Sequence, residues 1–203
     1  MASSSKDDLD DEVLRRNCVL VRKVADVNAQ EYYATPESLQ PTELAFGTRQ
    51  VRDAPSFMHQ EAVSAFFVAL REHARGRALG RVCIAPLDVV LDEARALIVQ
   101  PDVFYVSNER DGIVGHRIYG PPDLVVEVLS PQPRVGDLER RLEWFASYGV
   151  RECWAYHQTA QQLEIVTFVN GAIDRRTFIA LDGTIDSPCL PEFRFTLRQV
   201  LDR

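Results

Sequence analysis

The sequence predicts an α/β fold in which a mixed β-sheet is flanked by helices. Two segments carry apolar residues at helical spacing, and short runs rich in valine and isoleucine lie between and after them. The chain has 203 residues, 46% of them hydrophobic, which is enough to bury a core without disulfides or a structural metal. We expect a single domain over residues 13–203, preceded by a disordered acidic tail over residues 1–12.

An amphipathic helix is predicted from Phe57 to about Ala74, after an N-terminal region that we also expect to be helical. Gly76 follows as a stop signal. The apolar residues recur every three or four positions, as one face of a helix requires: Met58, Ala62, Val63, Phe66, Phe67 and Leu70.

Three strands are predicted next, in consecutive antiparallel order, from the runs "RVCIAPLDVVLD", "ALIVQPDVFYVS" and "DLVVEVLS". A second helix follows in "GDLERRLEWFASYGV", where Leu138, Leu142 and Phe145 form a stripe and Gly149 is a C-cap. The runs "ECWAYH", "QQLEIVTFV" and "RRTFIAL" predict further strands, with a hairpin turn at Asn170-Gly171 and a short terminal helix in "FTLRQVLDR".

Charge and composition restrict the classes of partner. Thirty acidic against 23 basic side chains give a net charge of −7, so any contact with DNA must be local, with Arg134, Arg140 and Arg141 as candidates. No apolar run approaches the roughly 20 residues that span a bilayer, so we expect no membrane contact. The four cysteines are dispersed without a CxxC pair, and we expect a cytoplasmic protein with reduced thiols.

A glutamate interrupts the apolar run of "GPPDLVVEVLS". Burying a lone carboxylate costs several kcal/mol unless it is paired or bound to a cation, so Glu127 needs a partner. If "QPDVFYVS" and this run form an antiparallel hairpin centred near Val114 and Gly115, Asp102 lies directly opposite Glu127. Opposed side chains are about 5 Å apart at Cβ.

Two carboxylates at this separation repel each other unless a divalent cation lies between them, so the pair predicts a Mg²⁺ or Mn²⁺ site. Asp123 shares the strand face of Glu127 but lies four residues away, about 13 Å, too far for one ion. Two other interpretations stay open. Pro-Asp is common at turns, and Glu127 could face solvent or form a salt bridge with an arginine.

These residues also carry a family resemblance. From about Glu43 to the C-terminus the chain resembles the Uma-type endonuclease family, which is similar to the PD-(D/E)XK restriction endonuclease-like superfamily. The matching motifs are "TELAFG", "FMHQEAV", "IAPLDVVL", "VQPDVFYVS", "GPPDLVVEVLSP" and "DLERRLEWFASYGVRECWAY". The resemblance implies a restriction endonuclease-like core in which Asp102 and Glu127 hold Mg²⁺ for phosphodiester hydrolysis.

The resemblance further implies that Glu43, from the N-terminal helical region, and Asp88, from the preceding strand, are accessory acidic residues at the metal. The alternatives are a helix-capping or solvated Glu43 and a surface Asp88. By the same resemblance His59 lies near the site, whereas a histidine at a helix start is often structural.

One position departs from the motif. The lysine expected two residues after the glutamate is Leu129, and in this family the lysine lies on the following helix, where the chain has Arg141. Arginine can stabilise a phosphate but cannot act as a base at neutral pH. The alternative is that Arg141 lies on a solvated helix face beside Arg140.

Three functions therefore stay open. The first is a Mg²⁺-dependent endonuclease that cleaves DNA as a homodimer, with Asp102, Glu127 and Arg141 as catalytic residues. The second is a catalytically degenerate binding module with the same fold. The third is an α/β domain without a nucleic-acid role.

Overall fold

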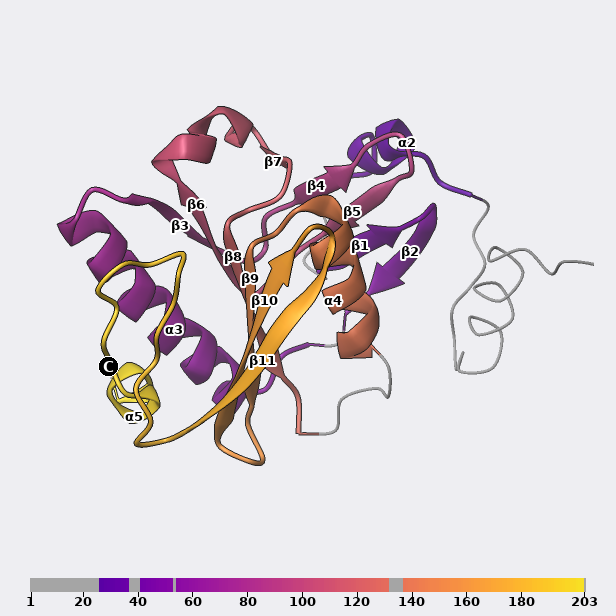
Figure 1. Cartoon of the computed structure of the whole chain (residues 1–203). Helices are drawn as coiled ribbons and strands as arrows, with labels where there is room; N and C mark the ends of the chain where they lie inside the picture. The colour runs from indigo at the N-terminus through magenta and orange to yellow at the C-terminus, as the bar shows by residue number, and fades with distance from the viewer. Residues whose placement is uncertain (1–25, 37–40, 53, 132–136, 203) are drawn as a thin grey trace, which may run out of the picture.

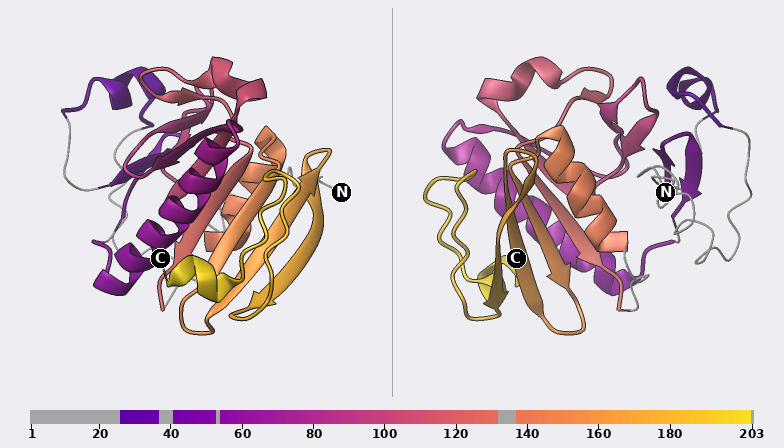
Figure 2. Two further views of the ribbon diagram at one scale, coloured as in Figure 1. Left: turned by 90° about the vertical axis from the view of Figure 1, so that its left-hand side faces the viewer. Right: turned by 45° about the vertical axis from the view of Figure 1, so that its right-hand side comes forward.

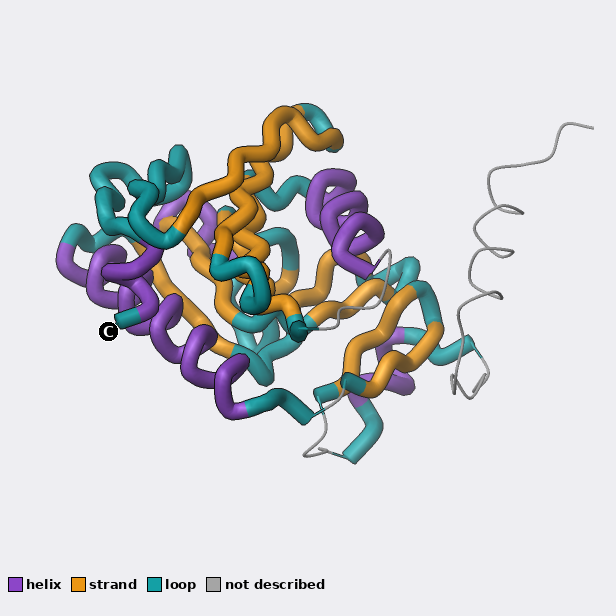
Figure 3. Tube along the Cα trace, turned by 90° about the horizontal axis from the view of Figure 1, so that it is seen from below, coloured by secondary structure: helices purple, strands orange, loops and turns teal. Residues whose placement is uncertain are grey.

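The computed structural model describes residues 26–36, 41–52, 54–131 and 137–202 (Figure 1). Two β-sheets form the centre, with helices on the outside (Figure 3). The elements in chain order are α2 (Ala29–Tyr33), β1 (Thr42–Ala45), β2 (Thr48–Val51), α3 (Phe57–Gly76), β3 (Gly80–Ile84), β4 (Val89–Asp92), β5 (Leu97–Val99), β6 (Val103–Ser107), the 3-10 helix η1 (Asn108–Ile113), β7 (Ile118–Tyr119), β8 (Leu124–Leu129), α4 (Asp137–Tyr148), β9 (Glu152–His157), β10 (Gln162–Val169), β11 (Ala172–Ala180) and α5 (Leu197–Leu201).

The larger sheet has six strands in the order β11-β10-β9-β8-β6-β3. Only the β8–β9 pair is parallel within it, because α4 connects these two strands as a crossover. Helices α3 and α5 cover one face of this sheet, and α4 covers the other (Figure 2). The mixed sheet flanked by helices confirms the predicted fold class.

Side chains alternate between the two faces along each strand of the large sheet, so its apolar residues contribute to two hydrophobic cores, one on each face. Val103 and Tyr105 of β6 pack toward α3, whereas Phe104 and Val106 pack toward α4. On β8, Val126 belongs to the α3 side and Val125 to the α4 side. Glu127, two residues after Val125, therefore belongs to the face that α4 covers.

The first two of the three predicted strands are each broken at a proline. Pro86 separates β3 from β4, and Pro101 separates β5 from β6, because proline cannot donate a ladder hydrogen bond. The second half of the first run, β4, and the first half of the next, β5, join β1, β2 and β7 in a smaller five-stranded sheet, ordered β2-β1-β5-β4-β7. The prediction of three unbroken strands was wrong, but β3, β6 and β8 are antiparallel neighbours in the large sheet.

The N-terminal region differs from the expected helical structure. Its described part holds the short helix α2 and then the β1–β2 hairpin, which turns at Phe46 and Gly47, both with positive φ. Glu43 therefore lies on a strand of the small sheet. The expected acidic tail, residues 1–12, lies outside the described residues.

The helices predicted after the N-terminal region are confirmed, as is the hairpin at Asn170-Gly171. Gly149 ends α4 with φ +91°, and Val150 donates a hydrogen bond to the carbonyl of Phe145. Asn170 and Gly171 have positive φ in the β10–β11 turn. Cys83, Cys153 and Cys189 are free thiols. Among the described residues, no helix is long and apolar enough to cross a membrane.

Candidate active site

The candidate site starts from the register of β6 and β8. Val103 lies opposite Val126 and Phe104 opposite Val125, so the next step of the ladder brings Asp102 beside Glu127. This is the predicted register, although the loop between the strands holds η1 and β7 rather than a simple hairpin turn. The backbone N–H of Val128 donates a hydrogen bond of 2.7 Å to Asp102 Oδ2, which fixes the aspartate against β8.

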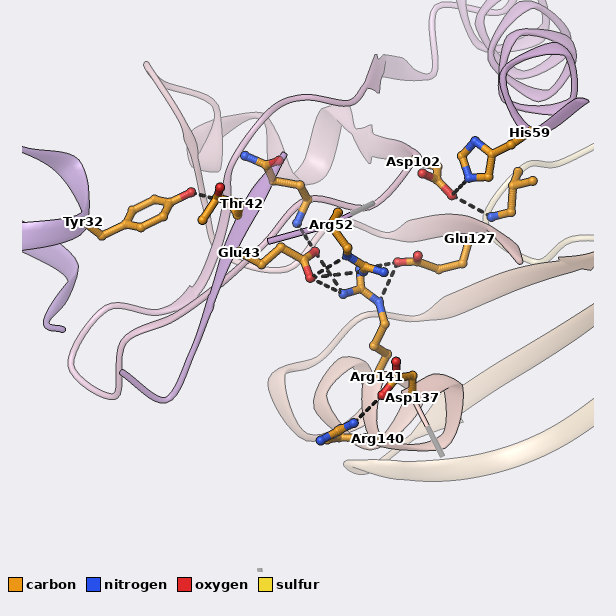
Figure 4. Close-up of polar contacts among 12 residues, drawn as sticks. Tyr32, Thr42, Glu43, Arg52, His59, Asp102, Glu127, Asp137, Arg140 and Arg141 are labelled. Atoms are coloured by element: carbon orange, nitrogen blue, oxygen red, sulfur yellow. Dashed lines mark hydrogen bonds and ion pairs between the residues drawn. The ribbon is translucent and has the colours of Figure 1, made fainter. Parts of the chain in front are cut away.

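His59 reaches the same carboxylate from the first turn of α3. Its Nε2 lies 3.4 Å from Asp102 Oδ2 (Figure 4). Burial alone would lower the pKa of His59, but the neighbouring carboxylates of Asp102 and Glu127 raise it overall. The structure therefore brings together Asp102, Glu127 and His59, with His59 as a partner of Asp102.

Arg141 of α4 bridges two buried carboxylates. Its Nε donates to Glu127 Oε1 at 3.0 Å, and its Nη1 donates to both oxygens of Glu43 at 2.9 Å. Only 8% of its side chain is exposed, so the alternative of a solvated helix face is wrong. Of the interpretations left open for Glu127, the salt bridge with an arginine is the one observed (Figure 4).

The carboxylate of Glu43 accepts hydrogen bonds from several residues. Arg52 Nε donates to its Oε2 at 3.1 Å, and the backbone N–H of Gln100 donates to its Oε1 at 2.7 Å. Burial would raise the pKa of Glu43, but the charges of Arg141 and Arg52 hold it below its usual range. Glu43 is therefore a buried anion rather than a helix cap, and Arg141 is its main counter-ion.

Asp88 is connected to the site only indirectly. Its oxygens accept from Tyr32 Oη at 3.0 Å, from Gln100 Nε2 at 2.8 Å and from Arg117 Nε at 2.9 Å. Gln100 thus joins Asp88 to Glu43 across the small sheet. The four predicted acidic residues form a row: Gln100 connects Asp88 to Glu43, Arg141 connects Glu43 to Glu127, and Asp102 lies directly beside Glu127.

The four acidic residues do not surround a single point where they could all bind one cation. Among the described residues, no three Asp, Glu, His or Cys side chains are grouped so that they could hold one metal ion. The expected set of four ligands is therefore not gathered at one point, because the guanidinium of Arg141 lies between Glu43 and Glu127.

The pair of Asp102 and Glu127 still fits a hydrated divalent ion. The described residues use only Oδ2 of Asp102 and Oε1 of Glu127, which leaves one oxygen of each carboxylate available. The Asp102 side chain is 21% exposed, so solvent reaches the pair. Burial raises the pKa of Glu127, and Asp102 adds to this while Arg141 opposes it. Mg²⁺ commonly binds one or two carboxylates and keeps several waters.

Two members of the network, Arg52 and Gln100, were not predicted from the sequence. Gln100 directly precedes the Pro-Asp motif, and no periodic signal marks Arg52. The burial of Arg141 did have a signal. Arg141 lies three residues after Leu138 and four before Phe145, which puts it on the apolar stripe of α4. Arg140 lies off this stripe.

The fold is that of a mixed α/β protein whose larger sheet carries a pair of carboxylates on adjacent strands. The chain belongs to the Uma2 family, described as "Putative restriction endonuclease", whose model matches residues 29–198. No curated protein matches the chain. A solved structure described as "a putative nuclease belonging to DUF820", from Anabaena variabilis, is similar with a TM-score of 0.75 and 14% identity, over 87% of this chain and 98% of that one.

Proposed function

We propose that the protein is a divalent-metal-dependent endonuclease that hydrolyses phosphodiester bonds in DNA. The observation that carries this proposal is the register of β6 and β8, which sets Asp102 beside Glu127, each with one oxygen that none of the described residues contacts. Membership of a family described as restriction endonucleases supports the reaction class. The metal is Mg²⁺ or Mn²⁺, because the available donors are hard carboxylate oxygens.

In this proposal Asp102 and Glu127 are the metal ligands. When bound, the ion supplies positive charge for the phosphodiester and lowers the pKa of water. His59 and the N–H of Val128 hold Asp102 in place, while Arg141 holds Glu127. Glu43 orients Arg141, and Asp88 orients Gln100, so we assign both to positioning rather than to the metal.

Arg141 contributes through position and charge. Burial opposes its charge, but Glu127 and Glu43 raise the pKa of the guanidinium, which stays protonated and cannot take a proton from water. The water must therefore lose its proton to another acceptor. We further propose a homodimer, because one such site cuts a single strand and a two-fold pair cuts both.

A degenerate binding module is the second candidate, and the same arginine favours it. Arg141, which the resemblance places at the family's lysine position, lies between two glutamates with only 8% of its side chain exposed, which shields it from a phosphate in solvent. A module of this kind binds DNA but does not turn over.

The test is nicking of supercoiled plasmid DNA with Mg²⁺ or Mn²⁺, combined with calorimetric titration of Mn²⁺. We expect Asp102→Asn to lower both the nicking rate and the Mn²⁺ affinity at least about tenfold, about 1.4 kcal/mol. Asp111→Asn, an exposed aspartate on η1, is the control and should change neither. Metal-dependent DNA binding without nicking would establish the second candidate. Unchanged Mn²⁺ affinity in Asp102→Asn would exclude the metal site.

A further inference from the structure

Arg52 brings a second cation to the candidate site. It directly follows β2, and its backbone N–H donates a hydrogen bond of 2.9 Å to the carbonyl oxygen of Pro41, which fixes the start of the side chain. From there the guanidinium reaches Glu43, with Nε and Nη2 both 3.1 Å from Oε2 (Figure 4). The proposed function assigns no role to this arginine.

The hydrogen bonding of Glu43 is complete without Arg52. Nη1 of Arg141 donates to both carboxylate oxygens, and the backbone N–H of Gln100 donates to Oε1. Only 2% of the Glu43 side chain is exposed, whereas 42% of the Arg52 side chain is exposed. The contact therefore orients an exposed guanidinium that Glu43 does not require for its own hydrogen bonds.

The two arginines at Glu43 differ in what they can still bind. The side chain of Arg141 is 8% exposed, and its guanidinium donates to Glu43 and Glu127. Solvent reaches the guanidinium of Arg52, and none of the described residues contacts its Nη1. Of the two, only Arg52 can therefore donate to a phosphate that enters from solvent. A planar guanidinium suits this contact, because several of its N–H groups can face phosphate oxygens.

The charge of Arg52 also acts at the carboxylate pair. Burial raises the pKa of Glu127, whereas the charges of Arg141 and Arg52 lower it, so Arg52 lies within electrostatic reach of this carboxylate. When Glu43, Asp102 and Glu127 are ionised, they exceed the two arginines by one negative charge. A divalent ion gives these groups one net positive charge, and without Arg52 they would be neutral. Arg52 therefore supplies the net attraction for a phosphodiester.

We propose that Arg52 is a substrate-binding residue that donates to a non-bridging oxygen of the DNA phosphodiester beside Asp102 and Glu127. The inference rests on the proposed function and goes beyond it, because it identifies the cation that holds the phosphate. Glu43 then orients both arginines, Arg141 toward Glu127 and Arg52 toward the substrate. Since the contact is with the DNA backbone, its strength should not depend on the base sequence.

The test compares Arg52→Gln with the wild type in two titrations, one of a fluorescent DNA duplex in Ca²⁺ buffer and one of Mn²⁺ by calorimetry. We expect about tenfold weaker DNA binding, equal for duplexes of different sequence, because a charged hydrogen bond to phosphate is lost. Affinity for Mn²⁺ should rise at least about twofold, because a positive charge that repels the ion is removed. A role confined to holding Glu43 would not raise the Mn²⁺ affinity while lowering the DNA affinity.

Arg77 provides the matched control. Its side chain is 44% exposed, and its Nε lies 3.2 Å from a carboxylate oxygen of Glu192, at the C-terminal end of α3. Arg77→Gln should change neither affinity. Arg52→Lys should bind DNA more tightly than Arg52→Gln, because lysine keeps the positive charge without the planar fork. Melting temperatures of the three variants show whether a substitution disturbs the fold.

Three results would overturn the inference. If Arg52→Gln binds both DNA and Mn²⁺ like the wild type, Arg52 does not contact the phosphate, and the proposed function stands. If Arg52→Gln loses Mn²⁺ affinity and melts at a lower temperature, Arg52 has a structural role instead. If the wild type neither binds Mn²⁺ nor nicks DNA, the proposed function fails and the inference fails with it.

Discussion

Arg141 shows at the scale of one residue how a surface-type side chain becomes structural. Its guanidinium donates to Glu127 and Glu43, both of which are buried. The planar fork of arginine matches two carboxylates at once, which the single ammonium of a lysine does not. An arginine at this position therefore fits the presence of two buried anions.

Removing the positive charge of Arg141 should lower the free energy of unfolding. Arg141→Met leaves Glu43 and Glu127 buried without their shared counter-ion, and breaking a buried pair typically costs about 3–5 kcal/mol. Urea denaturation followed by circular dichroism measures the loss. The neighbouring Arg140→Met removes only a half-exposed pair with Asp137, worth about 1 kcal/mol or less. Equal losses in the two variants would contradict the bridging role.

At the scale of elements, β3 and β6 approach each other very closely at their ends. Gly80 pairs with Ser107, and a Cβ at Gly80 would lie 2.1 Å from the backbone oxygen of Val106. No side chain fits at that distance without moving one of the strands. Because β6 leads back to Asp102, this close pairing also fixes the strand that carries the site.

A pair of glycine substitutions tests this packing. Gly80→Ala should destabilise the protein by about 2 kcal/mol or more, since backbone must shift to make room. Gly76→Ala, at the end of α3 with open space around its Cα, should be neutral or stabilise by about 0.5 kcal/mol. Thermal melts of both variants give the comparison. A Gly80→Ala protein that melts like the wild type would show that the strands are not held this closely.

His73 connects α3 to the C-terminal segment and makes that contact sensitive to pH. It is buried, its Nε2 is 2.9 Å from the carbonyl oxygen of Pro191, and its ring packs edge-on against Phe193. The carbonyl can only accept, so Nε2 donates in the neutral ring. Burial and the charge of Arg77 lower the pKa of His73, although Pro191 and Glu192 act in the opposite direction.

Stability should therefore fall as the pH drops below about 6.5, the usual histidine pKa, because the unfolded chain then binds a proton that the folded one resists. The loss is complete once the pH is below the folded pKa. Urea midpoints at pH 5.5 and 7.5 should differ less in His73→Gln than in the wild type. His116→Gln, at an exposed position, should keep the wild-type difference. An unchanged difference in His73→Gln would contradict the assignment.

At the scale of the whole molecule, the acidic charge limits how DNA can be held. The net charge of −7 repels phosphate at long range, and Arg141, one of the candidate DNA contacts, is buried in ion pairs. Arg140 is paired with Asp137, but its side chain is 36% exposed and can be reached from solvent, and Arg134 lies outside the described residues. Binding must then come from a few local contacts.

Affinity for DNA should fall with salt, but with a shallow slope. About three phosphate contacts give a slope near −2 for log K against log salt concentration on a single strand. Fluorescence anisotropy at a series of KCl concentrations in Ca²⁺ buffer measures it. Arg140→Gln should reduce the slope by about one unit. A slope of zero would contradict this prediction, because it would mean that contacts with bases, and none with phosphates, supply the affinity.

The sequence by itself determined the two long helices, two of the turns and the register of β6 against β8. Periodicity located α3 and α4, and turn chemistry located Gly149 and Asn170-Gly171. Centring the intervening loop near Val114 and Gly115 placed Asp102 opposite Glu127. These are local properties, set by backbone geometry and by alternation along a strand, and a strand slip of one residue would expose its apolar face.

Only the tertiary structure decided what the carboxylates contact. Glu43, Gln100 and Arg141 come from β1, the end of β5 and α4, and they meet because a second sheet packs beside the first. From the sequence alone, Arg141 can be interpreted as a solvated or as a catalytic residue, because the identity of a charged side chain does not show whether it is buried. The physical reason is that local spacing puts Arg141 on the apolar stripe of α4, but the two anions that stabilise its buried charge lie far along the chain, and spacing does not identify them.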